Sequence, residues 1–155
     1  MHEADSNIIT SASRVVERCL AERRGTSHVM ASMPELRPAS GDELAQIVRL
    51  ATRVIGAQRR LQFALGNDRS RLSSGRSRDL VVASLVEAGH SRPPDLDYLP
   101  SAEEMQNRLQ AIADPKERFA VSHSIPDWLV APLREAFGDD VDAVLQALGQ
   151  AAPRT

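Results

Sequence analysis

The chain has 155 residues, of which 42% are hydrophobic and 26% charged, values that are ordinary for a globular protein and exclude wholesale disorder. The single cysteine, Cys19, excludes an internal disulfide, and no long apolar run or signal-peptide pattern is present, so we expect a cytoplasmic protein that does not enter a membrane. Aromatic residues make up only 3%, whereas Ala, Leu, Arg and Glu dominate. This composition predicts an all-α fold, a bundle of about six to eight helices.

The net charge of −2 hides an uneven distribution along the chain. Residues 44–94 contain nine arginines and three acidic residues, a net charge of +6, whereas residues 95–155 have a net charge of −6. All basic residues except Lys116 are arginine. Arginine makes planar, bidentate contacts with phosphate, which fits RNA binding, but a GC-rich genome also raises the arginine content. The composition fits both explanations equally.

The first predicted helix covers residues 6–24, because apolar residues recur there at the spacing of one helical face. That face consists of Ile8, Ile9, Ala12, Val15, Val16, Cys19 and Leu20. Gly25 is the expected C-terminal stop of this helix. A short helix is expected to follow through Val29, Met30 and Met33 and to end at Pro34.

Ser40 and Glu43 form a capping box, which predicts that one long helix runs from Ser40 to about Leu65. Its apolar side contains Leu44, Ile47, Ala51, Val54, Ile55, Leu61 and Leu65. On the opposite side lie Arg49, Arg53 and Arg60, within roughly 40° of one another. The pattern predicts one face in the core and a basic stripe on the other face.

Residues 66–79 lack periodicity and are rich in Gly, Ser and Arg, which predicts a loop. The following helix, 79–88, is apolar on all sides and is expected to be buried before Gly89 ends it. After a Pro-rich connector, a second capping box at Ser101 predicts a helix over 101–112. Another short helix is expected from Pro115.

The C-terminal part predicts two helices, 126–137 and about 139–148. Ser124 is the expected cap of the first, with Pro126 in its first turn and Pro132 kinking or dividing it. The expected buried stripes are Trp128, Leu129, Leu133, Ala136 and Phe137 in the first helix and Val141, Val144, Leu145 and Leu148 in the second. Trp128 is expected to be a core anchor between this segment and the rest of the bundle.

The sequence contains no recognisable catalytic arrangement. The glycine-rich turn of a cofactor-binding fold and the Gly-x-Ser-x-Gly turn of hydrolases are absent, and the four histidines lack metal-ligand spacing. Cys19 lies on an apolar helix face, where a thiol is usually inert. We therefore expect no catalytic residue, metal or cofactor in this chain.

Arginines are the only candidate binding residues that the charge pattern identifies. The candidate RNA-binding site consists of Arg49, Arg53, Arg59, Arg60, Arg69, Arg71, Arg76 and Arg78. If the loop folds back beside its helix, these side chains can contact RNA phosphates without reading the base sequence. The alternative is a solvated helix face next to an ordinary surface loop.

The segment from Phe119 to Gly138 contains Pro126-Asp127-Trp128-Leu129, and a second helix then leads to Ala152-Pro153. This segment resembles the one that precedes the catalytic domain in Sun-type rRNA (cytosine-5) methyltransferases, and the chain ends at Thr155, where the next strand of that family would begin. More weakly, residues 40–65 with Arg59-Arg60-Leu61 resemble the second conserved helix of the family's N-terminal domain, whose fold is like that of the antitermination factor NusB.

The resemblance implies a NusB-like domain over residues 1–118 and, over 119–155, a helical segment packed on it. It implies a bacterial protein of rRNA processing that binds RNA, with rRNA the expected class, and is no enzyme by itself. Methyl transfer in that family uses two cysteines. The resemblance implies that these cysteines and the S-adenosylmethionine site belong to a methyltransferase domain in the same or another chain. The alternative is a NusB-like or other helical module for protein interaction or regulation.

Overall fold

A computed structural model describes residues 3–66, 76–96 and 98–150, in which all regular elements are helical. The α-helices are α1 Glu3–Glu22, α2 Thr26–Ala31, α3 Gly41–Gly56, α4 Gln58–Ala64, α5 Arg76–Glu87, α6 Ala102–Gln110, α7 Pro115–Ser122, α8 Asp127–Phe137 and α9 Val141–Gln150. Short 3-10 helices occur at Pro34–Leu36, Pro94–Leu96 and Gly138–Asp140. The predicted all-α fold is confirmed, and no helix in these ranges is long and apolar enough to cross a membrane.

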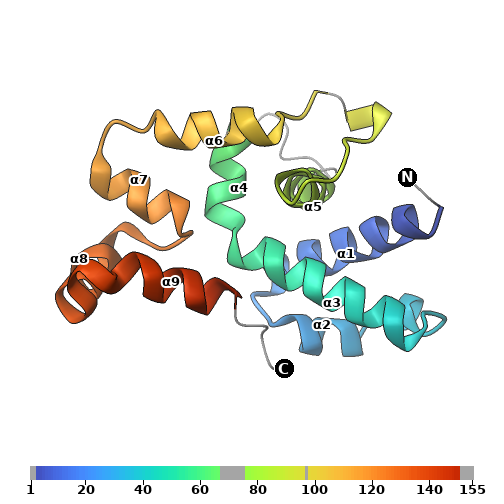
Figure 1. Ribbon diagram of the computed structural model, residues 1–155. Helices are drawn as coiled ribbons and strands as arrows, with labels where there is room; N and C mark the ends of the chain where they lie inside the picture. Colours follow the sequence, from blue (N-terminus) through green and yellow to red (C-terminus); the bar gives the residue numbers. More distant parts are fainter. Residues whose placement is uncertain (1–2, 67–75, 97, 151–155) are drawn as a thin grey trace.

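The core forms where α1 packs against α3 and α5 (Figure 1). The predicted apolar face of α1 is confirmed, because Ile9, Ala12, Val15, Val16 and Cys19 are all buried. Helix α5 is buried on most sides through Leu80, Val81, Val82, Ala83, Ser84 and Val86. It passes through the middle of the bundle, as its uniformly apolar sequence predicts.

Both predicted capping boxes mark real helix starts. The Ser40 hydroxyl oxygen accepts a 3.2 Å hydrogen bond from the backbone amide of Glu43 at the start of α3. The Ser101 hydroxyl oxygen accepts a 3.1 Å bond from the amide of Glu104 at the start of α6. Each serine satisfies an amide that has no partner within its own helix.

The single long helix predicted over residues 40–65 is wrong, because the chain breaks at Ala57 into α3 and α4. Ala57 has φ −107° and ψ 14°, outside helical geometry, and it follows Gly56, a residue of low helix propensity. The break turns α4 away from the axis of α3 (Figure 1), so that α4 packs against α5, α6 and α7. Ala57 and Leu61 are both buried by this turn.

The predicted stop of α1 at Gly25 is also wrong. Helix α1 ends at Glu22, and Arg23 adopts the left-handed backbone conformation with φ +54°. The amide of Arg24 then donates to the Cys19 carbonyl at 3.3 Å. Gly25 has an extended conformation and forms the N-cap of α2.

Helices α8 and α9 lie at the edge of the bundle, where α8 packs against α7 and α9 (Figure 1). Within the described ranges, neither of them makes an extensive contact with α1 to α6. The domain boundary expected at residue 118 falls inside α7. Each of the helices α7, α8 and α9 therefore packs against the next one in the chain. Helix α7 connects α8 and α9 to the bundle through its contacts with α4 and α6.

The buried stripe predicted for α8 is wrong in its main residue. Trp128 is 72% exposed and Phe137 43% exposed, whereas Val130 is buried. Of the other predicted residues, Leu129 and Leu133 are half-buried and Ala136 is exposed. Helices α7 and α9 pack against α8 but leave the side that carries Trp128 uncovered. In α9, Val141 is buried and Val144 and Leu145 are half-buried, while the side chain of Leu148 lies outside the described part.

The start of α8 differs from the prediction as well. Pro126 occupies the N-cap position, and Ser124 makes no cap hydrogen bond to α8. Helix α8 is one helix from Asp127 to Phe137 and is not divided at Pro132. Gly138, with φ +56°, ends it as predicted, because glycine tolerates the left-handed region.

Candidate nucleic-acid interface

Arg49 and Arg53 lie one turn apart on α3, and both are exposed. Neither side chain makes a hydrogen bond or ion pair with any residue that the structure describes. Ile47, Ala51 and Val54 of the same helix are buried. The predicted opposition of a basic face and a core face is thus confirmed for α3.

Arg59 and Arg60 lie on α4 and make contacts that hold the fold together. Arg59 donates to the Ile125 carbonyl at 2.5 Å and to the Asp127 carboxylate at 2.9 Å, which ties α4 to the start of α8. Arg60 pairs with Glu87 at the end of α5, and about three quarters of each side chain in this pair is buried. Because the chain breaks at Ala57, Arg60 lies on a different helix from Arg49 and Arg53, and its guanidinium group is paired with Glu87.

Arg78 is also paired, with the carboxylate of Asp95 at 2.8 Å. The hydrogen bond from Arg78 lowers the pKa of Asp95 below its ordinary value. Arg76 begins α5, but its side chain lies outside the described part. Arg69 and Arg71 lie outside the described residues altogether.

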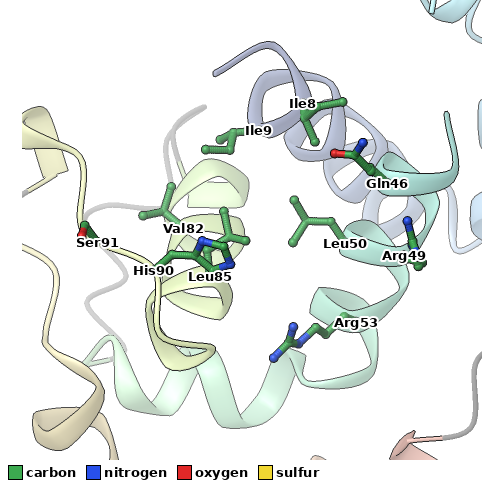
Figure 2. A pocket seen from close by; sticks show the side chains of 10 residues that line it. All are labelled: Ile8, Ile9, Gln46, Arg49, Leu50, Arg53, Val82, Leu85, His90 and Ser91. Atoms are coloured by element: carbon green, nitrogen blue, oxygen red, sulfur yellow. The ribbon is translucent and has the colours of Figure 1, made fainter. Parts of the chain in front are cut away.

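Arg49 and Arg53 line a pocket between α1, α3 and α5 (Figure 2). The pocket has a volume of about 400 Å³. We call it the α1/α3/α5 pocket. Its apolar lining consists of Ile8, Ile9, Leu50, Val82 and Leu85. Its polar lining consists of Gln46, Arg49, Arg53, His90 and Ser91.

The electrostatics of the α1/α3/α5 pocket favour an anion. Among the described residues, the lining contains two guanidinium groups and no acidic side chain. The two acids nearest in sequence within α5 are engaged elsewhere, Glu87 with Arg60 and Asp79 with the hydroxyl of Tyr98. The positive charge of Arg49 and Arg53 is therefore not neutralised by an ion pair.

The sequence does not predict the pocket itself or four of its lining residues, Gln46, Leu50, His90 and Ser91. Leu50 was not assigned to either face of its helix, although it follows Arg49 directly and precedes Arg53 by three positions. His90 is one of the four histidines that lack metal-ligand spacing, and the sequence indicates no other role for it. The available signal was Gly89, which ends α5 with φ +103° and turns the chain so that His90 and Ser91 reach the opening.

The thiol of Cys19, the one cysteine of the chain, is shielded by the core. Cys19 is 4% exposed, and burial raises the pKa of its thiol, an effect that Glu22 increases and Arg18 opposes. No group of three or more His, Cys, Asp or Glu side chains is placed to hold a metal ion within the ranges described. The arrangement at α3 is suited to binding rather than to reaction.

No protein-family model matches the chain, and no curated protein or solved structure shows a match to it. What indicates a function is the geometry at α3 together with the sequence resemblance of the C-terminal segment.

Proposed function

We propose that this chain is a helical module that binds RNA, rRNA being the expected class, and presents it to an RNA (cytosine-5) methyltransferase domain in the same or another chain. The observation that carries the proposal is the pair of unpaired, exposed guanidinium groups of Arg49 and Arg53 beside the α1/α3/α5 pocket. In this proposal the fold belongs with NusB-like domains, and S-adenosylmethionine binds to the other domain.

The contacts to RNA would be mainly electrostatic. Residues four positions apart on a helix project from the same face, so Arg49 and Arg53 can bind one phosphate together or two successive phosphates. Each contact releases counterions from the RNA and positions the strand without reading its bases. Arg59, Arg60 and Arg78 are engaged with carboxylates and contribute less to this surface.

The C-terminal segment supports the link to a methyltransferase domain. Its residues 119–138 carry the resemblance to Sun-type enzymes, and in the fold they form the second half of α7 and all of α8. Trp128, Ala131 and Pro132 are exposed and lie at helical spacing on one side of α8. We propose that this side contacts the catalytic domain.

The same exposed side favours a second candidate function, a module that binds a protein partner and no RNA. A tryptophan that is 72% exposed is costly to hydrate and is common at the centre of protein interfaces. The two functions differ in salt dependence, because an apolar interface responds weakly to salt whereas phosphate contacts respond strongly.

The test is a salt titration of binding between the full chain and a fluorescently labelled RNA hairpin from rRNA. RNA binding through phosphates predicts a straight decline of log K against log salt, with a slope of about 0.7 to 0.9 for each phosphate contact. Calorimetry with S-adenosylmethionine is expected to show no binding to this chain. Absence of RNA binding at low salt, together with capture of a protein through Trp128, would favour the second function.

A further inference from the structure

We infer that the α1/α3/α5 pocket holds one unstacked nucleotide of a single-stranded RNA, its base on the apolar lining and its phosphate on Arg49 and Arg53. This inference rests on the proposed RNA binding and adds its mode, a single strand in place of a duplex. Three features of the pocket support it: its size and apolar lining, the position of the guanidinium groups, and the unused polar groups of Gln46, His90 and Ser91.

The apolar lining explains why a duplex cannot place a base in the pocket. The volume of about 400 Å³ lies within the ordinary range for pockets that bind small molecules. Side chains from three helices form the lining: Ile8 and Ile9 from α1, Leu50 from α3, and Val82 and Leu85 from α5 (Figure 2). The bases of a duplex are stacked inside the double helix, so only an unstacked base can reach these aliphatic groups.

The cationic groups stand on one side of this lining. Arg49 and Arg53 both come from α3, whereas His90 and Ser91 come from the connector after α5, across the opening (Figure 2). A ligand that spans the pocket from α3 to this connector therefore meets the guanidinium groups at one end and the imidazole and hydroxyl groups of His90 and Ser91 at the other. A nucleotide has this polarity, with its phosphate at one end and the edge of its base at the other.

The remaining polar groups of the lining distinguish a nucleotide from a simple apolar anion such as a fatty acid. Gln46, His90 and Ser91 are exposed and make no side-chain hydrogen bond to other described residues. An aliphatic chain would leave all three groups without a ligand partner, whereas the ring nitrogens and exocyclic groups of a base can bond to His90 and Ser91. Gln46, which lies on α3 with the arginines, can bond to the sugar or the phosphate. The lining therefore fits a base better than a hydrocarbon chain.

The experiment compares two RNAs with the full chain: a single-stranded 12-mer that contains one 2-aminopurine, and the duplex of this strand with its complement. Ser91→Trp places a bulky side chain at the opening, and Leu50→Phe reduces the apolar space from inside. Ser27→Trp is the matched control, because Ser27 is exposed on α2 and does not line the pocket. Circular dichroism checks that each variant is folded, and Arg49→Gln/Arg53→Gln tests RNA binding at α3 independently.

We expect the single strand to bind more tightly than the duplex, with a rise in 2-aminopurine emission as the base unstacks. Ser91→Trp and Leu50→Phe are expected to weaken single-strand binding roughly fivefold or more, because the base loses its contacts with the apolar lining, while Ser27→Trp leaves it unchanged. Duplex binding is expected to be equal in all three variants.

Two outcomes overturn the inference and remain distinguishable. If the pocket variants bind the single strand like the wild type, but Arg49→Gln/Arg53→Gln weakens binding, RNA binds at α3 and the pocket holds no base. If none of these variants changes RNA binding, the proposed function fails at this site. Competition by decanoate but not by adenosine or cytidine 5′-monophosphate would assign the pocket to an apolar anion and also overturn the inference.

Discussion

The hydroxyl oxygen of Ser124 accepts a 3.0 Å hydrogen bond from the backbone amide of Arg60, 64 positions earlier in the chain. Arg60 is the third residue of α4, so its amide is one of those that the helix itself leaves unpaired. At the other end of α4, Arg108 donates to the Ala64 carbonyl at 2.6 Å. Residues remote in sequence thus cap both ends of this short helix.

Ser124→Ala is expected to destabilise the protein by about 1 kcal/mol, within the usual effect of losing an N-cap. Ser124 also has φ +54°, where asparagine and glycine are tolerated better than alanine. Ser124→Asn keeps an acceptor and should remain near the wild type, and Ser124→Gly should fall between the two. Urea unfolding measures the three values, and equal stability of the Ala and Asn variants would contradict the capping role.

Arg60→Ala is expected to lower the free energy of unfolding by about 1 to 2 kcal/mol, because it leaves the carboxylate of Glu87 partly buried without its partner. The matched control is Arg53→Ala, an exposed arginine without a partner, which should change stability by less than about 0.5 kcal/mol. A double-mutant cycle with Glu87→Ala measures the coupling energy. Zero coupling would mean that the ion pair contributes nothing to stability.

Trp128→Ala is expected to change the free energy of unfolding by less than about 1 kcal/mol, because the indole is 72% exposed. Trp128 is the only tryptophan, so intrinsic fluorescence reports on it alone. Its emission should resemble that of free tryptophan in water and should be quenched readily by acrylamide. Blue-shifted emission that acrylamide does not quench would show that the side chain is buried.

Cys19 is expected to react slowly with Ellman's reagent in the folded protein and quickly in urea, because it is buried and its thiol pKa is raised. As the pH rises, the unfolded chain loses this proton before the folded chain does. The thiol therefore contributes a loss of stability above its ordinary pKa of about 8.5. Rapid reaction of the folded protein at neutral pH would contradict the burial of Cys19.

The sequence predicted most helices, because their signals are local. The spacing of Ile9, Val16 and Cys19 and the serines at 40 and 101 depend only on neighbours a few residues away. The break at Ala57 was not predictable in this way, since α4 is held by Ser124 and Arg108, which are distant in sequence. Helical periodicity also marked Trp128 as apolar without showing that its side chain is exposed.

The candidate site was predictable only in part for the same reason. Periodicity placed Arg49 and Arg53 on the exposed face of α3. It could not show that the neighbouring Arg59 and Arg60 have carboxylate partners on α8 and α5, or that Arg78 meets Asp95. Net charge counts every arginine equally, whereas the fold leaves some available and engages others.

The most direct test of the central claim compares RNA binding by two double variants that each remove two positive charges. Arg49→Gln/Arg53→Gln removes the unpaired groups of α3. Arg14→Gln/Arg37→Gln is the control, since both residues are exposed, lack partners among the described residues and do not line the α1/α3/α5 pocket. Affinity for the rRNA hairpin is measured over a range of salt concentrations for both variants and the wild type.

The proposal predicts that Arg49→Gln/Arg53→Gln binds more weakly and has a shallower salt slope, by roughly one unit for each phosphate contact removed. The control variant should stay close to the wild type in both quantities. Equal loss of affinity in the two variants would mean that only overall charge matters. Unchanged affinity and slope in Arg49→Gln/Arg53→Gln would contradict the claim that α3 binds RNA.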